Sequence, residues 1–323
     1  MQPDKENIMR YSFKPIELSG VKTCSIKERH SKVSLSDSAK IWKKGESFNS
    51  FIDSLPHILA GNHVREVISS LSFAFHNKKT VVFAMGAHVI KTGLNPVVID
   101  MMERGVITAV ALNGAGIIHD FELAMTGQTS EDVDASLGDG TFGMSHETCA
   151  FLSKAILMAG QENTGLGQAV GSMIIEEDLP FISSSILAAG ARLKIPVTVH
   201  VAMGTDIIHM HPEFNPEYAG GASHRDFRIF ASVISSLEGG VYLNVGSAVI
   251  LPEVFLKALT LARNVGSKIE NFASVNMDFI RHYRPMTNVV NRPTAKGGRG
   301  FNIIGHHEIM LPLIAAGVIE RIS

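Results

Sequence analysis

Residues 113–122 begin with a glycine-rich turn and continue with histidine and acidic side chains. His119 and Asp120 come just after Gly116, the last glycine of this turn. A histidine whose orientation is fixed by a neighbouring carboxylate can serve as a general acid or base. The same two residues could instead cap the start of a helix. We therefore treat His119 and Asp120 as candidate catalytic residues and keep helix capping as the alternative.

The turn itself is typical of a phosphate-binding segment. Asn113, Gly114, Ala115 and Gly116 follow an apolar run and precede a helix-like stretch. Glycines in this place let a dinucleotide approach the backbone, and the first N–H groups of the helix attract its phosphates. The pattern is incomplete because His119 stands where the GxGxxG spacing has its third glycine.

An earlier turn at residues 85–93 has a similar character. Gly86 and Gly93 flank His88 and Lys91 in this segment. The two glycines permit close approach of a ligand to the backbone, and the following helix offers N–H groups to an anion. It is equally consistent with the sequence that His88 only caps a helix and that Lys91 is solvated.

A third turn, at residues 200–213, is rich in histidine. It contains His200, Asp206, His209 and His211, the last two at HxH spacing. Histidine and carboxylate side chains at such spacing are metal ligands in many proteins. The alternative is that Asp206 orients a ribose or substrate hydroxyl and that no metal is bound.

Basic residues are concentrated between residues 281 and 300. Arg284, Arg292 and Lys296 lie there among several glycines. Guanidinium groups bind carboxylates and phosphates through paired N–H donors. The segment is predicted to be an anion-binding loop, and a mobile solvated loop is the alternative.

Composition and charge exclude several other classes of protein. The 323 residues include 29 Lys and Arg against 31 Asp and Glu, which gives a formal net charge of −2. This near-neutral balance argues against nucleic acid as the main partner, because phosphate binding is built on an excess of clustered positive charge. The two cysteines match no zinc spacing, and no apolar run is long enough to predict a membrane span. We expect a cytoplasmic protein with a small-molecule substrate, bound neither to nucleic acid nor to a membrane.

Short apolar strands alternate with helices along most of the chain, and these elements must position the residues above. We predict strands at 80–84, 107–112, 195–201, 241–245, 272–276 and 301–304. We predict helices at 48–76, 94–104, 118–126, 130–137, 145–159, 180–193, 225–237, 253–264 and 306–317. This alternation predicts one α/β domain over residues 46–323, with a mostly parallel, doubly wound sheet. Residues 1–45 are polar and lysine-rich and are predicted to form an N-terminal extension.

Residues 75–320 resemble the deoxyhypusine synthase family. Residues 85–93 are similar to the family's first glycine-containing turn, and residues 112–120 are similar to its Thr-Thr-Ala-Gly-Gly-Val-Glu-Glu-Asp stretch. Residues 194–197 look like the start of its "IPV" strand, and residues 310–316 look like its final helix.

The resemblance implies a Rossmann-like domain that binds NAD and assembles as a homotetramer with sites at subunit interfaces. It implies that an amine carbon gives hydride to NAD, and that a lysine captures the resulting imine. Lys296 is the best match for this lysine, and Asp206 is the nearest candidate for the family's acidic residue after the "IPV" strand. The residues expected to contact the cofactor are Gly86, His88, Thr92, Gly93, Asn113, Gly114, Ala115, Gly116, Gly246 and Ser247.

Departures from the family pattern predict a different substrate. Residues 244–252 replace the family's segment with a catalytic histidine, and arginines replace its acidic polyamine-binding loop. A polycation would be repelled by these arginines, most strongly inside a pocket. We therefore expect an anionic or amino-acid-like substrate, held by Arg284, Arg292 and His209.

A second resemblance covers only the turn at residues 113–127. The pattern is similar to a motif in the NAD-containing ornithine cyclodeaminase portion of bifunctional arginine-degrading enzymes, and it comprises Asn113, Ala115, His119, Asp120, Glu122 and Gly127. Both resemblances imply transient oxidation of an amine by bound NAD.

The predicted function is that of an NAD-dependent transferase or cyclodeaminase-like enzyme that acts through imine chemistry but does not make deoxyhypusine. In this hypothesis His119 and Asp120 handle protons, and Lys296 is the nucleophile. Two alternatives are a metal-assisted hydrolase or lyase, and an NAD-binding protein without catalysis. The first alternative would use His200, Asp206, His209 and His211.

Overall fold

A computed structural model describes residues 12–322 of the chain, which divides into two units after Ser38. Within residues 12–38 of the first unit, two short 3₁₀ turns form at Leu18–Gly20 and Leu35–Asp37 and bury no residue. This division lies before the predicted boundary at residue 45, because Lys40 N donates a hydrogen bond to Ser54 O of the second unit. The part of the predicted extension at residues 1–11 lies outside the described residues.

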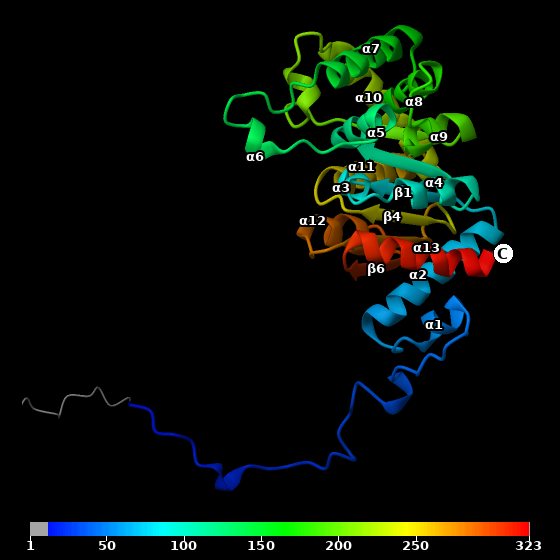
Figure 1. Cartoon of the computed structure of the whole chain (residues 1–323). Helices are drawn as coiled ribbons and strands as arrows, with labels where there is room; N and C mark the ends of the chain where they lie inside the picture. Colours follow the sequence, from blue (N-terminus) through cyan, green and yellow to red (C-terminus); the bar gives the residue numbers. More distant parts are fainter. Residues whose placement is uncertain (1–11, 323) are drawn as a thin grey trace, which may run out of the picture. The chain divides into compact units, whose positions relative to one another are not determined.

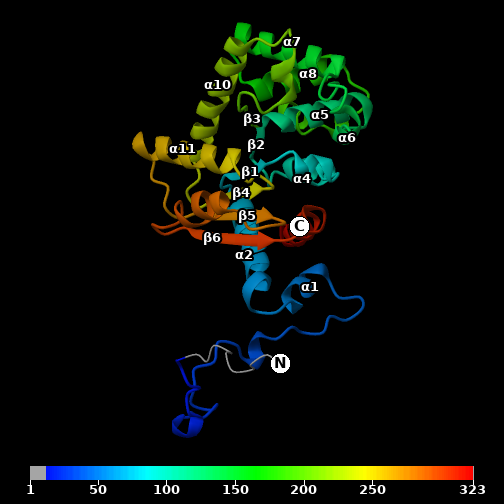
Figure 2. The ribbon, with the colours of Figure 1, turned by 90° about the vertical axis from the view of Figure 1, so that its left-hand side faces the viewer.

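The second unit, Ala39–Ser323, is built around a sheet of six parallel strands (Figures 1 and 2). The strands are β1 (Val81–Met85), β2 (Ala109–Asn113), β3 (Val197–His200), β4 (Val241–Val245), β5 (Ala273–Asp278) and β6 (Arg299–Ile304). Each predicted strand is confirmed, with ends that differ by at most two residues. The sheet is parallel at every pairing, which confirms the predicted fold class.

The strand order is β3-β2-β1-β4-β5-β6. The chain runs from β1 outward through β2 to β3 and then returns to add β4 on the other side of β1. In open α/β sheets this reversal creates a crevice at the carboxyl ends of the two central strands, and ligands bind there. The order of the strands therefore places the expected site beside the ends of β1 and β4.

Helices cover both faces of the sheet. Alternate side chains of β1 point to opposite faces, so that Phe83 and Met85 belong to one buried apolar cluster and Val82 and Ala84 to the other. The first cluster lies under α2 (Leu59–His76), α4 (Asn95–Glu103), α5 (Gly114–Thr126), α9 (Ile186–Leu193) and α13 (His307–Ile322). The second lies under α10 (Pro216–Ser235) and α11 (Ile250–Asn264), which Figure 2 shows on the opposite side of the strands.

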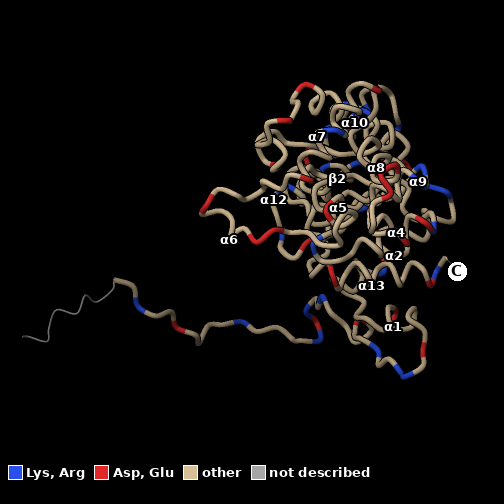
Figure 3. Tube along the Cα trace, turned by 45° about the horizontal axis from the view of Figure 1, so that its top comes forward, with Lys and Arg blue, Asp and Glu red and all other residues tan. Residues whose placement is uncertain are grey.

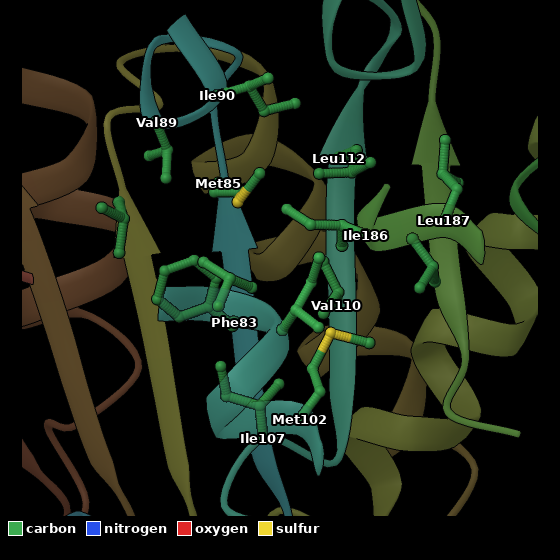
Figure 4. Close-up of a cluster of buried hydrophobic side chains, with 14 of the residues drawn as sticks. Phe83, Met85, Val89, Ile90, Met102, Ile107, Val110, Leu112, Ile186 and Leu187 are labelled. Carbon is green, nitrogen blue, oxygen red and sulfur yellow. The ribbon is translucent and has the colours of Figure 1, made fainter. Parts of the chain in front are cut away.

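The close-up in Figure 4 shows the first cluster between β1 and β2. Phe83 and Val110 extend from the two strands toward Met102 of α4, and Leu112 lies near Ile186 of α9. Phe83, Val110 and Leu112 each expose 2% or less of their surface. Because full burial of such a side chain contributes about 1.5–3 kcal/mol, this layer fixes the strands whose ends carry the site.

Most predicted helices form, with some differences. The predicted helix at 48–76 is two helices, α1 (Phe48–Ser54) and α2, because Pro56 interrupts the hydrogen-bond pattern. The structure adds α8 (Leu166–Glu176), which the sequence analysis omitted because Gly167 and Gly171 lower the helix propensity. A Cβ at Gly167 would lie 1.9 Å from Val197 O, so this glycine lets α8 pack directly on β3.

The remaining elements are short, apart from α7. The helices are α3 (His88–Lys91), α6 (Val133–Ser136), α7 (His146–Glu162) and α12 (Tyr283–Pro285). Two 3₁₀ turns, η3 (Ile182–Ser184) and η4 (Ile207–Met210), and a π-helical segment, η5 (Met286–Asn291), complete the set. Within residues 12–322, no helix combines the length and the apolar character needed to cross a bilayer.

Candidate active site

Two glycines join the ends of β1 and β4 at the point where the strand order reverses. Gly86 N donates a hydrogen bond to Val245 O over 2.9 Å. A Cβ on Gly86 would lie 2.2 Å from Gly246 O, so a larger residue would push the two turns apart. Gly246 has a φ of +65°, which favours glycine. The structure thus brings Gly86, Gly246 and Ser247, three of the residues predicted to contact the cofactor, to one place, although the N–H of Gly86 already has a protein acceptor.

A buried histidine lies against Gly246. His307, the first residue of α13, has no exposed surface, and its Nε2 lies 3.3 Å from Met277 O. Since Met277 O can only accept, Nε2 carries the proton and Nδ1 is an acceptor, and Nδ1 has no hydrogen-bond partner. Burial lowers the pKa of His307, although the hydrogen bond to Met277 O and the charge of Asp278 oppose the shift. The sequence analysis did not select His307, although it follows Gly305 just after β6.

Aromatic rings surround this histidine at the ends of β1 and β5. The ring centroids of His88 and His307 are 5.5 Å apart, and those of Phe279 and His307 are 6.1 Å apart. His88 and Phe279 are both exposed. Thr92, also predicted to contact the cofactor, donates its hydroxyl to His88 O and so closes α3, and Gly93 follows with a φ of +76°. His88 is thus at the ligand edge, whereas the Thr92 hydroxyl serves the local helix.

At the end of β2, Asn113 caps helix α5, because its side chain accepts a hydrogen bond from Gly116 N over 3.1 Å. Gly116 packs on the strand, and a Cβ there would lie 3.0 Å from Leu112 Cβ. A Cβ on Gly114 would lie 1.9 Å from Asp206 Oδ2. The space that the glycine leaves is therefore occupied by the protein's own carboxylate.

Asp206 comes from the turn after β3 and is nine-tenths buried at the start of α5. Burial raises the pKa of Asp206, although His209, the N–H groups of Ala202 and Ala115, and the Thr205 hydroxyl oppose the shift. Its Oδ2 has no hydrogen-bond partner. The structure thus places Asp206 beside Gly114 at the start of α5, with one acceptor atom that has no partner.

The structure separates Asp120 from His119. The carboxylate of Asp120 is fully buried and accepts hydrogen bonds from Ser185 Oγ, Ile186 N, Leu187 N and Asn95 Nδ2, at 2.5–3.1 Å. Burial raises its pKa to about 6. Two of these donors are the first N–H groups of α9, which have no acceptor within their own helix, so Asp120 caps α9 from a neighbouring helix. The geometry therefore favours the capping alternative for Asp120 over the predicted proton transfer.

His119 has different partners. Its Nδ1 lies 2.7 Å from Thr129 Oγ1 and 3.6 Å from Glu122 Oε2. Thr129 Oγ1 donates to Glu122 Oε2, and Thr148 Oγ1 donates to Glu122 Oε1 over 3.3 Å. Burial alone would raise the pKa of Glu122, but the hydrogen bonds from His119, Thr129 and Thr148 and the charge of His119 hold it below its usual value.

A cavity of about 510 Å³ opens beside this group. Its lining carries the carboxylates of Glu122, Glu131 and Glu147 and contains neither lysine nor arginine. The nearby segment with α6 also shows acidic positions in Figure 3. The cavity therefore has the charge to attract a cationic group, whereas the arginines had predicted a site for an anionic group.

The histidine-rich turn does not form a metal site. His200 is buried, its Nε2 lies 3.1 Å from Thr198 Oγ1, and burial lowers its pKa to about 3. His209 Nδ1 instead accepts from the N–H groups of Gly204 and Asp206. Among residues 12–322 no group of three histidine, cysteine or carboxylate side chains could hold a metal ion. The metal-assisted alternative is therefore not supported.

Of the predicted basic residues, Arg284 and Arg292 both lie near one carboxylate, that of Glu253, whose pKa is lowered by the hydrogen bond from Lys257 and by their charges. Arg284 Nε lies 3.6 Å from Glu253 Oε1, and Arg292 Nη1 donates to Asn288 Oδ1 over 2.9 Å. Lys296 is exposed and lies just before β6, at the amino end of the sheet. The six residues of β6 span roughly 20 Å at ~3.3 Å per residue, which separates Lys296 from the carboxyl edge. The geometry of one chain thus does not support the predicted nucleophilic role of Lys296.

No protein-family model matches the sequence, and no curated protein matches it. Solved structures with a similar fold include AgrE in a ternary complex with ornithine and NAD⁺, at 14% identity and a TM-score of 0.51. They also include ArgZ, an arginine dihydrolase from cyanobacteria, at 15% identity and a TM-score of 0.50, and a candidate deoxyhypusine synthase from Entamoeba histolytica, at 11% and 0.49.

These alignments cover 82% of this chain with AgrE, 80% with ArgZ and 88% with the Entamoeba histolytica protein. They cover 34%, 31% and 96% of the respective neighbours. The chain therefore spans about a third of the length of AgrE and ArgZ. At these identities the similarity shows a shared doubly wound α/β fold.

Proposed function

We propose that this protein is an NAD-dependent enzyme that transiently oxidises a C–N bond of an amino-acid-like small molecule. The observation that carries the proposal is the strand order β3-β2-β1-β4-β5-β6, whose reversal opens a site at the ends of β1 and β4. This order is that of dinucleotide-binding sheets. AgrE, which shares the fold, binds ornithine and NAD⁺ and so supports both parts of the proposal.

The residues at this edge fit a dinucleotide. Asp206 Oδ2 and His307 Nδ1 are buried acceptors without partners, and they lie on the two sides of the β1–β4 junction. A dinucleotide offers hydrogen-bond donors on its ribose hydroxyls and its carboxamide. We assign a ribose hydroxyl to Asp206, because this carboxylate at the start of α5 would repel a phosphate there.

The remaining predicted contacts divide into two kinds. Gly86, His88, Ala115, Gly246 and Ser247 lie at the carboxyl edge, where they can line the cofactor. Asn113, Thr92 and Gly116 maintain the turns, through capping and helix–strand packing. When bound, NAD would supply the hydride acceptor.

The acid-lined cavity next to His119 favours a substrate with an ammonium group. Glu122, Glu131 and Glu147 supply the negative charge. We assign the removal of a proton from the ammonium to His119, because its Nδ1 lies 3.6 Å from Glu122, a residue of the cavity lining. Loss of that proton leaves the amine lone pair free, which C–N oxidation requires.

The test is to add amines and amino acids to the protein with NAD and to record the absorbance of reduced nicotinamide. We expect reduced cofactor with a primary amine such as ornithine, and loss of this signal in His119→Gln. His76→Gln is a matched control, since His76 lies at the end of α2 and contacts Arg321 O. NAD bound without reduction by any amine would instead support the non-catalytic alternative.

A further inference from the structure

We propose that Thr129 and Glu122 are positioning residues that hold His119 in the tautomer with its proton on Nδ1. Nε2 is then left as the atom that accepts a proton from the substrate's ammonium group. The identity of this substrate rests on the proposed function, whereas the tautomer follows from this chain's own hydrogen bonds. The sequence had suggested Asp120 as the partner of His119, and the structure replaces it with these two residues.

The number of protons available in the contact between His119 and Thr129 determines the tautomer of His119. The Thr129 hydroxyl has one proton, and it is donated to Glu122 Oε2. Thr129 Oγ1 can therefore meet His119 Nδ1, 2.7 Å away, only as an acceptor. Nδ1 must carry the hydrogen, and in the neutral ring Nε2 is then the basic nitrogen.

Glu122 is held as an acceptor by its own surroundings. Thr148 donates to its second oxygen over 3.3 Å, and the carboxylate is partly buried. An ionised carboxylate has no proton to donate, so the direction of the Thr129 hydroxyl cannot reverse. Glu122 Oε2 also lies 3.6 Å from His119 Nδ1, where it attracts the positive charge that the ring gains with a second proton.

The proton transfer balances within this arrangement. A substrate ammonium gives one N–H proton to His119 Nε2, and the amine keeps the electron pair of that bond. The ring becomes an imidazolium, and its Nδ1–H stays on Thr129 Oγ1. Glu122 and Thr129 both line the 510 Å³ cavity, and His119 contacts these two residues without belonging to the lining itself.

The experiment measures the tautomer directly by NMR in protein labelled with ¹⁵N-histidine, without NAD or amine. Long-range ¹H–¹⁵N correlations distinguish a protonated ring nitrogen from an unprotonated one. His119→Gln identifies the His119 signals among those of the 14 histidines. The variants to compare are Thr129→Val, Thr129→Ser and Thr126→Val.

We expect neutral His119 in the wild type to carry its proton on Nδ1, and Thr129→Val to remove this preference. Thr129→Ser keeps the hydroxyl and should keep the tautomer. Thr126→Val is the matched control, because the Thr126 hydroxyl lines the same cavity but contacts only backbone groups. Its tautomer should equal that of the wild type.

A wild-type signal with the proton on Nε2 would overturn the proposal, as would an unchanged tautomer in Thr129→Val. An equal change in Thr126→Val would also contradict it, since the effect would then not depend on Thr129. If the protein proved unable to bind NAD, the proposed function would fail while the tautomer result still stood. The two claims therefore fail separately.

Discussion

Replacement of Asp120 by alanine should destabilise the protein strongly without removing its capacity to bind NAD. The change deletes the acceptor of four hydrogen bonds, two of them from the N–H groups of Ile186 and Leu187 at the start of α9. These N–H groups belong to the backbone of a helix and cannot turn to another partner. Both the side chain and its surroundings are buried, so water does not replace the carboxylate.

The size of the effect follows from these contacts. A buried donor left without a partner costs ~1–3 kcal/mol, and loss of a helix cap costs ~0.5–2 kcal/mol. We therefore expect Asp120→Ala to lower the free energy of unfolding by about 3 kcal/mol. A substitution of this size stands out clearly from surface changes, which usually stay within ~0.5 kcal/mol.

The assay is urea denaturation followed by circular dichroism, with NAD titration of the folded variant. Asp139→Ala is the matched control, because the Asp139 side chain is exposed and bonds only to the nearby Thr141. A loss below ~1 kcal/mol, together with loss of amine-dependent reduction, would refute the capping assignment. Asp120 would then be catalytic, as the sequence had suggested.

Three further outcomes are expected. Burial raises the pKa of Asp226 from the ordinary 3.8 to about 7. Between these values the folded protein binds a proton at Asp226 that the unfolded chain has released, so the free energy of unfolding should fall as pH rises from about 4 to about 7. Asp226→Asn should flatten this slope, which is at most ~1.4 kcal/mol per pH unit for one proton, in thermal scans at several pH values. Gly246→Ala should cost more than Gly266→Ala, by urea denaturation, because both have positive φ but only at Gly246 would the Cβ meet the His307 ring, at 2.9 Å. Equal costs would show that the contact with His307 adds nothing. The proposed homotetramer should give four times the chain mass in light scattering, and a monomer mass would contradict it.

Much of the fold could be predicted because its strands are nearly continuous apolar runs. The segment at 241–245 is buried at every residue, and its predicted ends match β4. Helix α8 could not be found in this way, because Gly167 and Gly171 reduce its helical signal. Glycine is required at these two positions by tertiary packing, since Cβ atoms there would collide with Val197 O and Leu187 O.

The site was predictable only where it lies at a strand end. Gly86, Gly246 and Asp206 follow β1, β4 and β3, so the rule that ligands bind at carboxyl ends brought them together. Lys296 was chosen by its place before the final helix, although the strand predicted at 301–304 already put it before a strand and so at the opposite edge of the sheet.

The partners of the candidate catalytic side chains were the hardest to predict. Adjacency in the sequence suggested that Asp120 orients His119, but neighbours in a helix point about 100° apart and do not face each other. Thr129 lies beyond the end of α5 and reaches His119 because the chain turns back at Gly127, whose φ is +70°. A polar residue after a helix-ending glycine was the one available signal.

Calorimetric titration of the cofactor-free wild type and of Asp206→Ala with NAD tests the central claim most directly. We predict one NAD per chain for the wild type and at least tenfold weaker binding for Asp206→Ala, which loses the charge-assisted hydrogen bond to a ribose hydroxyl, worth ~1.5–3 kcal/mol. Wild-type protein that is folded and yet binds neither NAD nor NADP would contradict the account. The glycine-rich edge of the sheet would then serve another ligand.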